Sequence, residues 1–150
     1  MKISDSFSIN SSALTAQRLR MDVISSNIAN AETTRSRIED GKAVPYRRKT
    51  VVMAPKELDF NSALDSAMGK GAVGQGVKIT KIQEDEAPFK PVYNPTHPDA
   101  DNEGYVYMPN VDILKEMVDM ISATRSYEAN VTALNASKAM ITKALQIGKS

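Results

Sequence analysis

The only histidine of the chain lies next to two carboxylates, in the run His97-Pro98-Asp99-Ala100-Asp101. Imidazole and carboxylate groups are common ligands of divalent metals, so His97, Asp99 and Asp101 could serve a metal-dependent hydrolase. A catalytic metal also needs rigid elements that hold its ligands around an open position. Prolines 88, 91, 95 and 98 leave this stretch without predicted rigid support. We therefore favour a turn, in which aspartates bond nearby backbone N–H groups, and keep the hydrolase as a competing hypothesis.

A glycine-rich run, Gly69-Lys70-Gly71-Ala72-Val73-Gly74, matches the string G-x-G-x-x-G of dinucleotide-binding sites. Such a site needs the string after a strand and at the start of a helix, where backbone N–H groups meet a pyrophosphate. In this chain a helix-like segment, residues 57–68, comes before the run, and a strand-like segment comes after it. The sequence therefore predicts a flexible linker over residues 69–76 and no nucleotide cofactor.

The composition argues against several other functions. The chain has no cysteine and shows no serine with a recognisable base partner, so we expect no enzyme, no metal and no cofactor. The formal net charge is only +1, so the cluster Arg47-Arg48-Lys49 indicates a solvated loop or a protein contact, with no nucleic acid as partner. No apolar run approaches the ~18 residues of a transmembrane segment. The N-terminus lacks the apolar core of a cleaved secretory signal.

Apolar residues at both ends of the chain recur every seven positions. This spacing predicts two long helices, over Ser4–Asn30 and from about residue 113 to Ile147, because such a stripe must be covered by another helix. We expect Ser4 or Asp5 to cap the first helix, and Asn110 or Asp112 to cap the second. The stripes are Phe7, Leu14, Met21 and Ile28 in the first helix, and Ile113, Met120, Tyr127, Leu134 and Ile141 in the second, flanked by Met117, Thr124, Val131 and Leu145.

Between the two helices the helical period is lost. Residues 49–53, 77–82 and 104–108 have the composition of short strands, whereas Thr33, Thr34, Ser36 and Gly41 indicate a loop. We therefore predict an α+β fold, mainly α, in which the terminal helices pack as an antiparallel, coiled-coil-like pair around a small β-rich insert. The predicted division is residues 1–33 with 109–150 as a helical core, and residues 34–108 as the insert.

The first helix also carries a long and unusual string, Ala-Leu-Thr-Ala-Gln-Arg-Leu-Arg-Met-Asp-Val-Ile-Ser-Ser-Asn-Ile-Ala-Asn-Ala, over residues 13–31. This string resembles the N-terminal signature of bacterial flagellar rod and hook proteins. Residues 45–49, 92–101, 104–111 and 116–130 are similar to the proximal-rod members of that family. Many of its other members continue with a Thr-x-Gly-aromatic step. Here Thr33-Thr34-Arg35-Ser36-Arg37 replaces that step, which agrees with the proximal-rod type.

The resemblance implies a structural subunit of the flagellar basal body. Such a subunit leaves the cell unprocessed through the flagellar export apparatus. It then assembles in the periplasmic rod with copies of itself, other rod subunits and a rod-base adaptor protein, around the export channel. The resemblance implies contacts between subunits at Leu14, Gln17, Arg18, Arg20, Met21, Asp22, Ile24, Asn27, Ile28, Asn30, Met117, Met120, Ile121, Arg125, Tyr127, Glu128, Asn130, Leu134 and Ile141.

The second helix is apolar over more of its surface than one partner helix can cover. Leu114, Val118 and Ile121 lie beside its main stripe, which favours contact with another chain. A helical adaptor or an export chaperone is a further alternative, and it differs from a rod subunit because a chaperone stays in the cytosol with its client.

Overall fold

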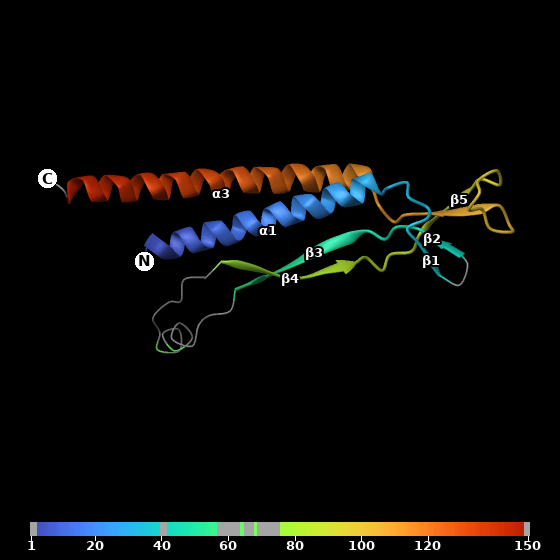
Figure 1. Ribbon diagram of the computed structural model, residues 1–150, viewed down its shortest axis with the longest axis horizontal. Helices are drawn as coiled ribbons and strands as arrows, with labels where there is room; N and C mark the ends of the chain where they lie inside the picture. Colours follow the sequence, from blue (N-terminus) through green and yellow to red (C-terminus); the bar gives the residue numbers. More distant parts are fainter. Residues whose placement is uncertain (1–2, 40–41, 57–63, 65–67, 69–75, 149–150) are drawn as a thin grey trace. The chain divides into compact units, whose positions relative to one another are not determined.

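The computed structural model describes residues 3–39, 42–56, 64, 68 and 76–148 (Figure 1). Among these residues, two long helices flank three short strand pairs in the order of the chain, which confirms the predicted α+β, mainly α class. The elements are α1 (Ile3–Ala29), β1 (Arg37–Glu39), β2 (Lys42–Val44), β3 (Lys49–Pro55), β4 (Val77–Glu84), β5 (Lys90–Tyr93), β6 (Tyr105–Met108) and α3 (Ile113–Ile147).

Three of the four helix termini lie where the sequence predicted them. Asn30 follows α1, and both its backbone N and its side-chain Nδ2 donate to the carbonyl of Ser26, at 3.1 and 2.9 Å. These bonds satisfy a carbonyl that the end of a helix would leave without a partner. At the start of α1 the prediction was wrong, because the helix begins at Ile3 and includes both proposed capping residues, Ser4 and Asp5.

Asp112 is the capping residue of α3. Its Oδ1 accepts from the backbone N of Leu114 at 3.0 Å and from that of Lys115 at 3.4 Å. These are two of the N–H groups that the first turn of a helix leaves without an internal partner. Asn110, the other candidate, uses its side chain elsewhere, as described below.

The covered side of α3 follows the predicted seven-residue repeat, with one revision. The prediction was right for Met120, Tyr127, Leu134 and Ile141 and for the flanking Thr124 and Val131, which are half-buried, and it was wrong for Ile113, Met117 and Leu145, which are exposed. A further line of covered residues was not predicted, because its members are polar or small and a search for apolar spacing passes over them. Together the covered positions, alternately four and three residues apart, are Glu116, Met120, Ala123, Tyr127, Asn130, Leu134, Ser137 and Ile141.

The strands in the described part of the chain form three separate pairs. The predicted strands at 49–53, 77–82 and 104–108 are confirmed as β3, β4 and β6, and β3 is hydrogen-bonded to β4. The antiparallel pair β5–β6 places Pro91 opposite Tyr107. Since each strand of a two-stranded pair is an edge strand, the proline fits there. The antiparallel pair β1–β2 was not predicted, because its two three-residue strands lie within a segment read as loop.

The predicted helix at 57–68 falls almost wholly outside the described residues, and so does most of the glycine-rich linker. Of the segment 57–68 the structure describes Leu64 and Met68, where the Met68 N donates to the Leu64 carbonyl at 2.9 Å. None of the described helices is long and apolar enough to cross a membrane.

The chain divides into two compact units that cut across both helices. The first contains Met1–Leu19, Val52–Lys81 and Ala123–Ser150, and the second contains Arg20–Val51 and Ile82–Ser122. Each unit therefore holds part of α1, part of α3 and part of the insert. The division into helical core and insert stays a prediction.

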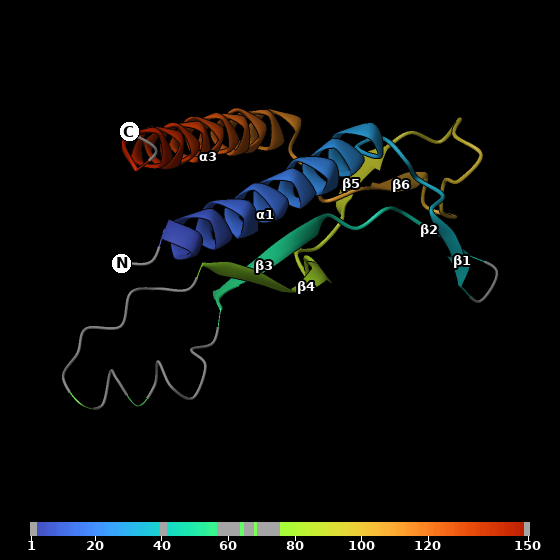
Figure 2. The same ribbon diagram turned by 60° about the vertical axis from the view of Figure 1, so that its left-hand side comes forward.

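In the first unit, Ser12 of α1 holds the start of β4. The Val77 N donates to Ser12 Oγ at 3.2 Å, and Ser12 Oγ donates to the Ile9 carbonyl at 2.7 Å. Figure 2 shows the strands β3 and β4 running beside α1. Gly76 makes this approach possible, because it has a φ of +101° and a Cβ atom there would lie 2.4 Å from Ser12 Oγ.

Gly76→Ala should therefore destabilise the protein. The substitution combines a strained backbone with a clash against Ser12 and the backbone of Ile9, and we expect a loss of about 1–3 kcal/mol in the free energy of unfolding. Urea denaturation followed by circular dichroism measures it. Gly148→Ala is the matched control, since a Cβ there meets nothing closer than 3.7 Å. Equal stability of the two variants would contradict this account.

Candidate functional site

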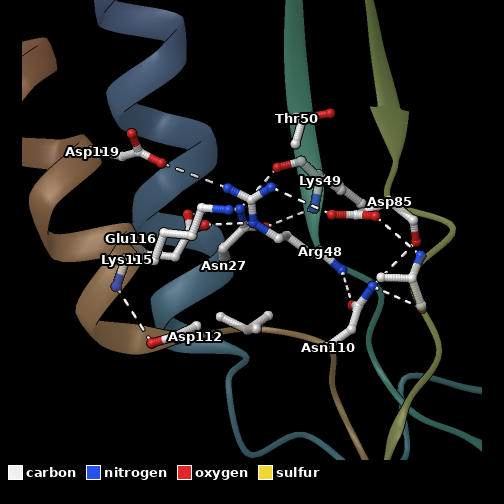
Figure 3. A network of polar contacts seen from close by, with 12 residues as sticks. Asn27, Arg48, Lys49, Thr50, Asp85, Asn110, Asp112, Lys115, Glu116 and Asp119 are labelled. Carbon is white, nitrogen blue, oxygen red and sulfur yellow. Dashed lines mark hydrogen bonds and ion pairs between the residues drawn. The ribbon is translucent and has the colours of Figure 1, made fainter.

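The second unit contains a cluster of polar side chains around Arg48, which we call the Arg48 cluster (Figure 3). Its members come from five segments of the chain: the end of α1, the residues before β3, the turn after β4, the bend before α3, and the first turns of α3. The cluster consists of Asn27, Tyr46, Arg48, Asp85, Asn110, Glu116 and Asp119.

Asn27 joins α1 to the start of β3. Its Nδ2 donates to the Lys49 carbonyl at 2.8 Å, and its Oδ1 accepts from the Lys49 N at 2.9 Å. The side-chain amide thus pairs with both backbone groups of one strand residue, as a neighbouring strand would. Nδ2 also donates to Glu116 Oε2 at 3.0 Å, and Oδ1 accepts from the Tyr46 hydroxyl at 3.0 Å. These bonds use the whole side chain, which is only 1% exposed.

Glu116 is the most buried charged residue that the structure describes, with 0% exposure. Arg48 Nε donates to Glu116 Oε1 at 2.6 Å, while the other carboxylate oxygen accepts from Asn27. Arg48 also makes longer ion pairs with Asp85, at 3.4 Å, and with Asp119, at 3.6 Å. Arg20 of α1 reaches the same Asp119, at 3.3 Å. A buried carboxylate needs such a partner, because its desolvation is otherwise far too costly.

Asn110 connects the cluster to the turn after β4. Its Oδ1 accepts from the Arg48 backbone N at 2.8 Å, and its Nδ2 donates to the carbonyls of Asp85 and Ala87, at 3.2 and 3.1 Å. This engagement explains why Asn110 does not cap α3. The amide therefore fixes the backbone of Arg48 as well as the loop that carries Asp85.

The charges of the cluster shift two pKa values in the directions that favour ion pairing. Burial lowers the pKa of Arg48, but the hydrogen bond and the charge of Glu116, helped by Asp85, together raise it above its ordinary value. The pKa of Asp85 lies below its ordinary 3.8, first because its carboxylate accepts from the Ala87 N and further because of Arg48. Both groups are therefore charged at neutral pH.

The sequence did not reveal this cluster. Arg48 was read as part of a solvated basic loop or a protein contact, whereas its side chain is 16% exposed and is bound within the chain. One signal was available: Glu116 is seven residues before Ala123 and four before Met120, so it lies on the covered side of the second helix. An acid at such a position requires a cation brought from elsewhere in the chain.

The predicted subunit-contact residues fall into three groups by exposure. Two are buried, namely Ile24 and Asn27. Those that are half-buried are Leu14, Gln17, Arg20, Met21, Ile28, Asn30, Met120, Tyr127, Asn130, Leu134 and Ile141. Those that are exposed are Arg18, Asp22, Met117, Ile121, Arg125 and Glu128. The exposed residues can meet another molecule directly, whereas Asn27 uses its side chain within its own chain.

The outer surface at the start of α3 is apolar. Five large apolar side chains, which we call the α3 apolar patch, share a face of the helix and have exposures between 44% and 76%. They are Ile113, Leu114, Met117, Val118 and Ile121. The same face becomes polar further along, at Arg125, Glu128 and Thr132. A contiguous apolar patch on a helix is typical of a protein–protein contact.

The run around His97 forms a turn. His97 Nδ1 accepts from the Asp99 N at 3.1 Å, and the Asp99 carboxylate binds Arg35 and Thr34. The Asp101 Oδ1 accepts from the Asn102 N at 3.0 Å. The histidine and both aspartates are thus engaged in the local structure. Among the described residues, no three of His, Cys, Asp and Glu gather where they could hold a metal ion.

Comparison with known proteins gives the same family along the whole chain. Residues 7–35 match the family "Flagella basal body rod protein", and residues 102–147 match "Flagellar basal body rod FlgEFG protein C-terminal". The chain is 60% identical to the flagellar basal-body rod protein FlgC of Bacillus subtilis, over 96% of this chain and 97% of that protein. It is 46% identical to FlgC of Borreliella burgdorferi, over 98% of each chain. It is 45% identical to FlgC of Escherichia coli O157:H7, over 99% of this chain and all of that protein.

These matches place the chain in the class of structural rod proteins of the flagellar basal body. Within this class, the chain belongs to the FlgC family. This family consists of structural proteins and not of enzymes, which agrees with the expectation from the sequence.

Glu116→Ala should destabilise the isolated chain by about 3–5 kcal/mol, because it leaves Arg48 without its nearest anion and removes one of the two acceptors of Asn27 Nδ2. Urea denaturation at pH 7 measures this loss. Glu128→Ala, which removes an exposed acid from the same helix, is the control and should change stability by at most about 0.5 kcal/mol. A loss below about 1 kcal/mol for Glu116→Ala would show that the cluster is not a main source of stability.

The stability of the chain should fall in acid below about pH 4. The folded pKa values of Asp85 and of Asp99, which Arg35 and Thr34 lower, lie beneath the ordinary 3.8. Such groups stabilise the fold above the unfolded pKa, and this contribution is lost as the pH falls through the folded value. Unfolding in urea between pH 7 and pH 3 should show a smaller acid loss for Asp85→Asn than for the exposed control Glu103→Gln. An unchanged acid loss in Asp85→Asn would exclude Asp85 as a source.

Proposed function

We propose that this chain is a structural subunit of the proximal rod of the bacterial flagellar basal body. In this role it assembles with copies of itself and other axial proteins into the helical shaft that transmits motor torque and surrounds the export channel. Membership of the FlgC family supports the rod assignment, and its relatives share nearly the full length of the chain. The exposed surface of α3 supports assembly.

The α3 apolar patch is the observation on which the proposal depends. Fully burying one large apolar side chain contributes roughly 1.5–3 kcal/mol, so covering five partly exposed ones is worth several kcal/mol. In an isolated molecule these side chains remain partly in contact with water, so this free energy is not gained. A neighbouring subunit with an apolar helix face would recover it, as in other assemblies that bury helix faces between chains. Of the predicted contact residues, Met117 and Ile121 belong to the patch.

The Arg48 cluster suits a subunit that carries mechanical load. It ties α1, the start of β3 and the start of α3 together through the hydrogen bonds of Asn27 and the short, charge-assisted bond between Arg48 and Glu116. A shaft transmits torque only if its subunits do not deform between their contacts. We infer that the cluster holds the patch-bearing end of α3 in a fixed orientation relative to α1 within the second unit.

We further propose that the chain reaches the periplasmic rod through the flagellar export apparatus without removal of a signal sequence. There it would meet the rod-base adaptor protein and the other rod subunits. An export chaperone would instead remain in the cytosol with its client. Fractionation of cells that make a tagged chain distinguishes the two: a rod subunit is recovered with purified basal bodies outside the inner membrane.

Val118→Asp should abolish motility and remove the chain from purified basal bodies. The side chain is exposed in the isolated molecule, so the variant should fold, but a carboxylate in the proposed contact would be buried without a partner. Val118→Leu is the matched control, because it keeps the site apolar, and it should support motility. Swimming on soft agar and immunoblots of purified basal bodies are the measurements. Motile cells with Val118→Asp would overturn the assignment of this patch as an assembly contact.

A further inference from the structure

We propose that a groove between α1 and β4 in one molecule receives the C-terminal end of α3 from a second copy of the chain. The inference rests on the proposed assembly function and names the partner at a second surface, distinct from the α3 apolar patch. It is carried by the shape of the groove, by the exposed apolar residues at the end of α3, and by opposite charges on the two surfaces.

The groove lies within the second unit and has a volume of about 520 Å³. Asp22, Val23 and Ser26 of α1 form one wall, and Ile82 and Glu84 belong to the wall contributed by β4. Val23 and Ile82 provide apolar surface. The carboxylates of Asp22 and Glu84 both lie on exposed residues at its edge. The volume is within the range of pockets that bind ligands of small-molecule size, so it can hold side chains of a helix.

One cation, Lys49, also lines the groove, but its ammonium group lies 5.6 Å from the centre of the Tyr46 ring. This cation–π contact gives the lysine a partner within its own molecule. The two carboxylates therefore outnumber the one cation, and the groove favours a partner that combines apolar and basic side chains.

The last turns of α3 carry such a combination. Met140, Lys143 and Ile147 are exposed and lie at positions i, i+3 and i+7, which places them on one face of the helix. This spacing is typical of helices that dock into grooves. No acidic residue follows Glu128 in the sequence, whereas three lysines do. The end of α3 is thus basic and apolar, and it complements the acidic groove.

The two surfaces are different parts of the molecule, so the contact between copies is heterologous. A heterologous contact that does not close into a ring continues from copy to copy and produces a helical array. The groove contact would accordingly add subunits in one direction, which is the property that a rod requires.

A charge exchange between copies tests the proposal. Association of the purified full-length chain is measured by sedimentation velocity at low salt, for wild type, Asp22→Lys and Lys143→Asp. We expect each single variant to associate about tenfold more weakly, because one attraction becomes a repulsion. An equal mixture of the two variants should recover association, since each groove then meets a terminus of opposite charge. The double variant should recover it as well.

Cysteine pairing gives a second measurement in cells, because the chain has no cysteine of its own. Chains with Gln83→Cys and chains with Ile147→Cys, made together, should form a disulfide-linked dimer after oxidation of purified basal bodies. Gln83→Cys with Asn135→Cys is the control and should not, since residue 135 lies on another face of α3.

Failure of the charge exchange to recover association, or no crosslink at the first pair, would overturn the groove contact. A crosslink at the control pair that is as strong as at the first pair would do the same, since it would show a different geometry. These outcomes leave the test of Val118→Asp unaffected, so a failure of the groove contact is distinguishable from a failure of the assembly function.

Discussion

A carboxylate without exposed surface is the constraint on which the second unit depends. The cost of desolvating the Glu116 carboxylate is offset because a cation and a hydrogen-bond donor reach its two oxygens. Arg48 supplies the cation from a position 68 residues earlier, and Asn27 supplies the second donor from α1. The start of β3, the end of α1 and the first turns of α3 must therefore meet at one place. Loss of Glu116, Arg48 or Asn27 would leave a buried polar group without a hydrogen-bond partner.

The same constraint decides which residues of α3 face outward. Because Glu116 and Met120 point to the covered side, a helix of ~3.6 residues per turn places Leu114, Val118 and Ile121 on the opposite side. The orientation of α3 that buries Glu116 in the Arg48 cluster therefore also leaves the α3 apolar patch exposed. The buried polar cluster and the exposed apolar patch of this segment both follow from the same orientation of α3.

The exposed surfaces of the molecule have different chemical character, which suits a subunit with several neighbours. The α3 apolar patch offers burial without charge, whereas the groove beside α1 and the end of α3 offer apolar surface together with opposite charges. Charge complementarity contributes more to the choice of partner and to register than to affinity. We infer that the apolar patch supplies the larger part of the binding free energy and that the charged surfaces determine which end of a neighbour docks.

The sequence by itself determined the two helices, the strands β3, β4 and β6, and the family. Helices and strands follow from the local spacing of apolar residues, and the signature over residues 13–31 is a continuous string, so both are visible without tertiary information. The turn at His97 was also predictable, since the bond from the Asp99 N to His97 Nδ1 joins residues two positions apart.

Only the tertiary structure decided the Arg48 cluster, the line of covered polar and small residues in α3, and the pair β1–β2. Each depends on partners that local spacing does not encode. Arg48 and Glu116 are far apart in the sequence, and Ala123, Asn130 and Ser137 are too small or too polar to mark a covered helix face. Arg37–Glu39 and Lys42–Val44 are each three residues long and show no period of their own. A sequence can reveal that a charge or a backbone group needs a partner. Which residue becomes that partner follows only from the fold.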